Sequence, residues 1–186
     1  MVDKNMISTL SGIRFNPLSP KPCDICIDDI AHALSLICRG NGQISCFYSV
    51  ARHSICCAKE AYERGLGARV ELLCLIHDAA EAYIGDMTRP LKRQMPKFAD
   101  CENELVKVIF EALEISPMNN DELKAVKEID NAMLYHEFKM MNGYELYDEV
   151  PIIHIEISTD FVDFKETETE FKKLFLNLKG EMKNGI

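Results

Sequence analysis

The segment "LLCLIHDAAEAYIGD", residues 72–86, constrains the fold more than any other part of this 186-residue chain. Its first half is apolar almost all round a helix, which is typical of a helix buried at the centre of a bundle. The segment nevertheless contains His77, Asp78 and Glu81, and burying polar groups without partners is costly. A helix over Ala68–Gly85 would place these three side chains over one stretch of its surface, because they are three and four residues apart. The segment therefore predicts a buried polar site.

The rest of the chain predicts an all-α fold: a helical bundle of about six or seven helices with minor extended structure at the N-terminus. Residues 1–27, with three prolines after Phe15, predict an extended lead-in packed on the domain, with a small hairpin as one option. Residues 28–186 are expected to form a single bundle, since a chain of this length that is 47% hydrophobic can build one core. Asn120 or Asp121 is expected to cap a late helix. The expected helices cover residues 27–40, 47–65, 68–85, 97–115, 119–142 and about 161–182, with a short segment at 89–94 and a candidate extended run at 150–157.

The charge balance excludes several classes of partner. A formal net charge of −9 and a pI near 5.1 argue against binding to nucleic acid or to a membrane surface. No window approaches the roughly 18 uninterrupted apolar residues of a membrane span, and the N-terminus does not resemble a signal peptide. We therefore expect a soluble, cytoplasmic protein, whose small anionic ligand would need a local basic cluster or a metal ion.

The eight cysteines are expected to be reduced thiols rather than a disulfide scaffold. Most lie in apolar runs that predict helices, among them Cys38, Cys56, Cys57 and Cys74. Cys23 and Cys26 form an isolated C-x-x-C, and no second pair completes a four-thiolate zinc site.

Two further polar residues point at the predicted core. His53 lies on an apolar helix face, three residues after Val50 and four before Cys57. Asp130 occupies a position in its helix where the apolar pattern calls for a hydrophobic residue. Two imidazoles and two carboxylates suit a divalent ion such as Mn²⁺, Co²⁺, Fe²⁺, Ni²⁺ or Zn²⁺. The candidate metal ligands are therefore His53, His77, Asp78 and Asp130.

These four residues resemble the H…HD…D signature of the HD-domain metal-dependent phosphohydrolases. The runs "FYSVARHS", "HDAAEAYIGDMTRPLK" and "KEIDNAM" look like the 5′-deoxynucleotidase-type branch, particularly its short bacterial and phage members. The lead-in "SGIRFNPLSP" and the run "IDDIAHALSLICRGNG" extend the similarity to about residues 8–142. One departure concerns the base pocket: many relatives have a bulky aromatic after the arginine of this run, whereas Gly40 follows Arg39 here. A wider or differently filled pocket is expected.

The resemblance implies hydrolysis of deoxynucleotides at the α-phosphorus, releasing a deoxynucleoside with phosphate or triphosphate. Some small phage-type relatives remove triphosphate from dATP. It also implies one divalent ion (Mn, Co, Zn, Fe, Ni or Mg), a homo-oligomer (dimer or larger ring), and the host cytoplasm if the chain is phage-encoded. Glu81 matches the family's general acid or base, and Asp86 matches an aspartate that supports the nucleophile or contacts substrate. The candidate phosphate-binding residues are Arg39, Arg89, Lys92 and Arg93.

Several alternatives stay open at this point. Asp86 could be a cap, the basic residues a solvated face, and Arg39 a charge that satisfies the dipole of a helix end. A non-catalytic nucleotide-binding or sensing module is the alternative function. A di-iron oxygenase is disfavoured, because residues 79–129 contain no further histidine, and the Gly-Tyr-Pro of cyclic-dinucleotide phosphodiesterases is missing. The remaining histidines, His32, His136 and His154, are expected to be structural.

Overall fold

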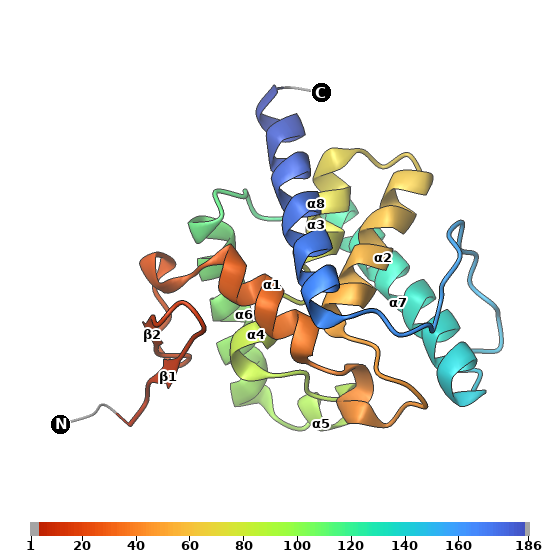
Figure 1. The fold of residues 1–186 in the computed structure, drawn as a ribbon, viewed down its shortest axis with the longest axis horizontal. Coiled ribbons are helices and arrows are strands. Elements are labelled where there is room, and N and C mark those ends of the chain that lie inside the picture. Colours follow the sequence, from red (N-terminus) through yellow and green to blue (C-terminus); the bar gives the residue numbers. More distant parts are fainter. Residues whose placement is uncertain (1–3, 185–186) are drawn as a thin grey trace.

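A computed structural model describes residues 4–184, and helix α3, Ala68–Ile76, lies at their centre (Figure 1). The apolar run from Leu72 to Ile76 is fully buried, as its composition predicts. Helices α2, α7 and α8 pack against α3. In the described range six longer helices and two single turns make up the bundle, and the predicted all-α fold is confirmed. The longer helices are α1 (Ile27–Leu36), α2 (Val50–Glu63), α3, α6 (Pro96–Ala112), α7 (Asn120–Asn142) and α8 (Phe164–Asn184).

The single turns are α4 (Glu81–Ile84) and α5 (Arg89–Lys92), and two 3₁₀ segments are η1 (Pro22–Asp24) and η2 (Arg39–Gly42). Among the helices of residues 4–184, none has the length and apolar character that crossing a bilayer requires.

The N-terminal region contains the small hairpin that the sequence suggested. Strand β1 (Ile7–Ser8) pairs antiparallel with β2 (Arg14–Phe15). Phe15 is fully buried, and its ring centroid lies 4.3 Å from that of Tyr83 in α4. This contact joins the hairpin to the element that follows the His-Asp doublet.

The prediction of one continuous helix over residues 68–85 is wrong. Helix α3 ends at Ile76, and residues 77–80 form a tighter turn in which Ala79 N–H donates to Ile76 O at 3.0 Å. His77 contributes a physical reason, because its Nδ1 donates to the carbonyl of Cys74 at 2.7 Å. A continuing α-helix would use that carbonyl for the N–H of Asp78. The doublet thus lies in a turn at the end of the buried helix.

The N-cap of helix α7 lies one residue before the first of the two predicted caps. Asn119, rather than Asn120 or Asp121, is the N-cap, and its side chain accepts the N–H of Glu122 at 2.9 Å. Glu122 in turn accepts the N–H of Asn119 at 2.8 Å, which completes a capping box. The start of this 23-residue helix, which contains Asp130, is therefore well defined.

The connection between α7 and α8, residues 143–163, crosses α2 without forming a strand. Side chains over residues 151–157 alternate between half-buried and exposed, as expected for an extended run, but no ladder partner accompanies them in the described structure. The buried carboxylate of Glu60 holds this connection, accepting the N–H groups of His154 at 2.7 Å and Ile155 at 3.2 Å.

Candidate metal centre

Four side chains from three parts of the bundle meet at one point. His53 comes from α2, His77 and Asp78 from the turn after α3, and Asp130 from α7. His53 Nε2 lies 3.3 Å from Asp130 Oδ1 and 4.0 Å from Asp78 Oδ2. His77 Nε2 lies 3.2 Å from Asp78 Oδ2 and 3.8 Å from Asp130 Oδ1. The structure therefore brings together all four residues that the sequence singled out as metal ligands.

Each imidazole turns its Nε2 toward the two carboxylates because its Nδ1 is bound elsewhere. The Nδ1 of His53 donates to Glu137, and the Nδ1 of His77 donates to the Cys74 carbonyl. His77 Nε2 is buried and has no hydrogen-bond partner in the described part of the chain. Two Nε2 atoms facing two carboxylates are a donor set that suits a borderline divalent cation. The residues present thus fit a divalent metal ion.

The charges at this point also call for a cation. Burial would raise the pKa of Asp78 and Asp130, but the neighbouring imidazoles lower both below the usual aspartate range. Burial would lower the pKa of His77 and His53, yet the carboxylates around them raise both above the usual histidine value. Without a metal, protons on the imidazoles compensate the carboxylates. A metal ion would replace these protons.

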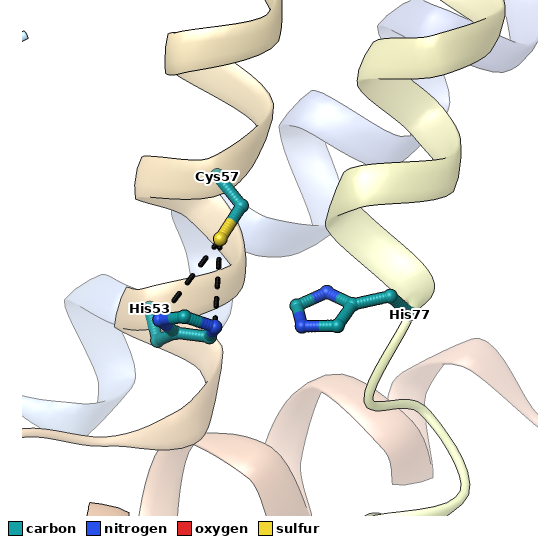
Figure 2. A group of neighbouring side chains, drawn as sticks. All are labelled: His53, Cys57 and His77. Atoms are coloured by element: carbon teal, nitrogen blue, oxygen red, sulfur yellow. Dashed lines mark hydrogen bonds between the residues drawn. The ribbon is translucent and has the colours of Figure 1, made fainter. Parts of the chain in front are cut away.

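Cys57 adds a thiol to the same neighbourhood. Figure 2 shows it one turn along α2 from His53, with the ring of His77 beside them on the neighbouring segment. Its Sγ lies 3.4 Å from His53 Nε2, and one potential ligand atom from each of the three residues falls within 4.8 Å of the others. These residues could therefore hold a metal ion. Burial, and then Asp130, raise the pKa of the thiol well above 9.0, so the two aspartates are the more available anionic ligands.

A cavity of about 530 Å³ opens in front of Asp78 and Asp130. Its lining combines charged and apolar side chains. The charged residues are Arg39, Asp78, Glu81, Asp86, Arg89, Lys92 and Asp130, and the larger apolar residues are Met87, Leu134, Phe138 and Leu146. The volume falls within the roughly 300–1,000 Å³ that small-molecule pockets occupy.

Comparison with known proteins places this site in a family. The family model described as "HD domain" matches residues 46–146, which is more than half of the chain and includes all four candidate ligands. The chain belongs to the HD-domain family. HD domains are generally metal-dependent hydrolases and bind divalent metal ions, in agreement with the donor set.

Two bacterial relatives match most of the chain. An uncharacterized protein of Rhodobacter capsulatus is 34% identical over 142 residues, which are 73% of this chain and 72% of the relative. The uncharacterized protein YfdR of Escherichia coli is 37% identical over 120 residues, which are 64% of this chain and 65% of YfdR. Neither name states a substrate. The similarity therefore supports membership of the family, and a proposal about the substrate has to be based on the residues that line the cavity.

Glu81 of this HD domain is a buried acid beside the ligands. It is 8% exposed, and its Oε2 has no hydrogen-bond partner within residues 4–184. Burial, and then the charges of Asp78 and Asp86, raise its pKa well above the usual glutamate value. A carboxyl group in this state can carry a proton at neutral pH. Asp86, which is half-buried, lines the same cavity.

The four predicted phosphate-binding residues do not share one position. Arg39, Arg89 and Lys92 line the cavity, whereas Arg93 is exposed and lies outside the residues that line it. All three lining cations contact carboxylates. Arg89 donates to Asp130 at 2.6 Å, Lys92 pairs with Glu102, and Arg39 lies between Asp78 and Glu137.

Arg39 does not end a long helix as one alternative supposed. Helix α1 stops at Leu36, and Arg39 begins η2 with its N–H bonded to Tyr48 O at 2.8 Å. The next residue, Gly40, has φ of +57°, and a Cβ built there would lie 3.0 Å from Cζ of Phe138. The ring of Phe138, from α7, thus occupies the space beside Gly40, and both residues line the pocket.

Sequence reasoning missed Glu137, which is fully buried and bound to His53. One signal could have indicated it. Glu137 follows Asp130 by seven residues, so both project from the same face of α7.

Proposed function

We propose that this HD-domain protein is a metal-dependent phosphohydrolase of deoxynucleotides. It would act at the α-phosphorus and release a deoxynucleoside together with phosphate or triphosphate. The single observation that carries the proposal is the cavity, whose lining includes two of the candidate ligands, Asp78 and Asp130, the buried acid Glu81, and the aromatic ring of Phe138 with three other large apolar side chains. The charged side chains suit a phosphate group, and the apolar side chains suit a nucleoside.

The residues that would hold one divalent ion are His53, His77, Asp78 and Asp130, the ion being Mn, Co, Zn, Fe, Ni or Mg. Such an ion, when bound, supplies Lewis acidity toward a phosphoryl oxygen and toward water.

Glu81 supplies the proton that the reaction needs. A water oxygen forms a bond to phosphorus, the bond from phosphorus to the ester oxygen breaks, and Glu81 gives its proton to that leaving oxygen. The proton lost by the attacking water restores the acid. Asp86 supports this role, because its charge helps keep the proton on Glu81.

The cations that line the cavity would bind the negative oxygens of the substrate. Arg39, Arg89 and Lys92 are available for this purpose, while the exposed Arg93 contributes at most a long-range attraction. Because each lining cation already contacts a carboxylate, phosphate would compete with those contacts.

The apolar side chains of the lining would contact the nucleoside. Phe138 and Leu134 come from α7 and Leu146 from the connection that follows it. A ring and aliphatic side chains together suit the flat, largely apolar face of a base.

The decisive experiment measures products. The purified full-length chain is incubated with deoxynucleoside mono- and triphosphates, with Mn²⁺, Co²⁺, Mg²⁺ or a chelator, and the products are separated by chromatography. We expect metal-dependent release of a deoxynucleoside, and the co-product identifies the substrate as a mono- or triphosphate. Binding of nucleotide without product under every metal condition would instead support the sensing module.

Two variants separate the proposed roles. Asp78→Ala removes a ligand, so we expect loss of metal binding together with loss of turnover. Glu81→Ala leaves the ligand set complete, so we expect metal binding to persist while most turnover is lost. Equal loss of metal from both variants would contradict this division of roles.

A further inference from the structure

Glu137 is the most completely buried acid near the candidate centre. Its side chain has no exposed surface, and its two carboxylate oxygens lie 2.9 and 3.0 Å from Nδ1 of His53. His53 is fully buried as well. Because an ionised carboxylate only accepts hydrogen bonds, the proton in this contact belongs to Nδ1.

This contact decides which nitrogen of His53 presents a lone pair to Asp78 and Asp130. A neutral imidazole has one N–H and one bare nitrogen. With the proton fixed on Nδ1, the bare nitrogen is Nε2, which lies 3.3 Å from Asp130. A metal ligand needs that lone pair, and a carboxylate behind a ligating imidazole commonly fixes it.

Arg39 connects Glu137 to a second candidate ligand. Its Nη2 lies 3.4 Å from Glu137 Oε2, and its Nη1 lies 3.5 Å from Asp78 Oδ2. Arg39 is itself largely buried, so this guanidinium compensates the charge of the fully buried Glu137. Asp78, Arg39, Glu137 and His53 therefore form one chain of contacts that runs from the cavity lining into the core.

We propose that Glu137 is a positioning residue for the metal centre: it selects the Nδ1–H tautomer of His53 and, through Arg39, links His53 to Asp78. The inference rests on the proposed metal-dependent function but concerns ligand geometry, which can be measured without turnover. Glu137 touches neither the cavity nor the substrate.

The same helix provides a matched control. Glu60, near the other end of α2, is also fully buried and lies 2.9 Å from Nδ1 of a histidine, His154. None of the four candidate ligands is among its hydrogen-bond or ion-pair partners in residues 4–184. Replacing either glutamate by glutamine removes one buried charge from one glutamate–histidine pair, but only one of the pairs faces the ligands.

The test compares Glu137→Gln and Glu60→Gln by titration with Mn²⁺ in a calorimeter. A glutamine amide can donate to Nδ1 and so favour the tautomer with a proton on Nε2. We expect the Mn²⁺ dissociation constant of Glu137→Gln to rise about 10- to 100-fold, and that of Glu60→Gln to stay at the wild-type value. Unchanged affinity in Glu137→Gln, or equal weakening in both variants, would overturn the proposal.

A second measurement uses the wild-type protein, so it can be made even if Glu137→Gln does not fold. The ¹⁵N shifts of the histidine rings are recorded on metal-free wild-type protein at a pH where His53 is neutral. We expect the Nδ1–H tautomer for His53, and finding the Nε2–H tautomer would refute the inference. If the tautomer and the affinity change are as expected but no nucleotide is hydrolysed, the proposed function fails and the positioning role stands.

Discussion

Helix α2 takes part in two glutamate–histidine pairs, one toward each end, that resemble each other in chemistry and differ in surroundings. His53 meets Glu137 and Glu60 meets His154, in each case with 2.9 Å between a carboxylate oxygen and Nδ1. Both carboxylates are fully buried, but the His53 side chain has no exposure whereas that of His154 is 50% exposed. The second nitrogen of His53 faces two aspartates, while the carboxylate of Glu60 also holds the backbone of the α7–α8 connection.

The difference shows that the contact alone does not give a buried glutamate–histidine pair its role. At the His53 end, the imidazole is presented to two aspartates that line the cavity. At the Glu60 end, the carboxylate attaches an irregular segment to a helix. The role of each pair therefore depends on what its other atoms reach.

The largest expected effect concerns a third buried glutamate, Glu81, whose Oε2 has no partner in the described structure. Glu81→Gln cannot donate an acidic proton, so we expect turnover to fall roughly 10²- to 10⁴-fold with metal affinity retained. Steady-state kinetics with a metal titration checks this result. Glu60→Gln, at the far end of α2, is the control and is expected to keep wild-type turnover.

Glu81→Gln is expected to lower turnover but not to lower the stability of the fold. The pKa of Glu81 is raised in the folded state, so the fold loses stability as pH rises from 4.5 through that pKa. Because glutamine does not ionise, Glu81→Gln is expected to melt at or above the wild-type temperature at about pH 8. A lower melting temperature would show that the glutamate is a structural residue.

Metal addition is expected to affect only the His53 end, and the effect should grow with pH. The pKa values of His53 and His77 are raised, so their protons stabilise the metal-free fold below 6.5, and this stability is lost as pH rises through the folded pKa values. Mn²⁺ replaces those protons and should raise the melting temperature more at about pH 8 than at about pH 6. At 100 times its dissociation constant the gain is about 2.7 kcal/mol, measurable by thermal scanning.

Asp78 and Asp130 determine how the stability of the metal centre changes at acidic pH. The pKa values of Asp78 and Asp130 are lowered, so their stabilising contribution is present above 3.8 and is lost as pH falls through the folded values. Metal stabilisation that increased on acidification would contradict this assignment of charges.

Breaking the other pair should loosen the connection without changing the metal centre. Glu60→Gln is expected to cost about 1–3 kcal/mol, because a buried group loses charged hydrogen bonds. Hydrogen exchange should become faster at the amides of His154 and Ile155, which donate to Glu60. Protection unchanged at both amides would show that other contacts hold the connection.

The smallest expected effect comes from Gly40→Ala. Position 40 has a left-handed conformation, which costs about 1–2 kcal/mol for a residue with a Cβ, and the new methyl would meet Phe138 at 3.0 Å. Thermal unfolding measures the loss of stability. The double variant Gly40→Ala with Phe138→Leu should recover the part that is due to the ring contact, but not the part that is due to the backbone.

The sequence predicted the long helices well because their apolar periodicity extends over many residues. It did not predict the break after Ile76, because both sides of the break continue the same apolar pattern and neither glycine nor proline marks it. The break depends instead on a side-chain contact, His77 with the Cys74 carbonyl. Such competition for one carbonyl is decided by three-dimensional packing.

In the candidate site, too, some residues could be predicted from the sequence pattern and others depend on three-dimensional packing. His53, His77, Asp78 and Asp130 could be found because each interrupts an apolar pattern, and the structure brings them together. Glu137 looks like an ordinary helix glutamate until its burial is known. The sequence predicts that the basic residues after Asp86 act as one cluster. The single turn α5 instead places Arg89 and Lys92, which are three residues apart, in the cavity lining and leaves Arg93 outside it.

The contact between Gly40 and Phe138 has a consequence for how the family can vary. Positions 40 and 138 compete for a single volume, although they are far apart in the chain and belong to different elements. Among homologues we expect the two positions to covary, with a bulky residue at one accompanied by a small residue at the other. A lineage could thus transfer the aromatic wall of the pocket from the η2 segment to α7 through an intermediate that has a small residue at both.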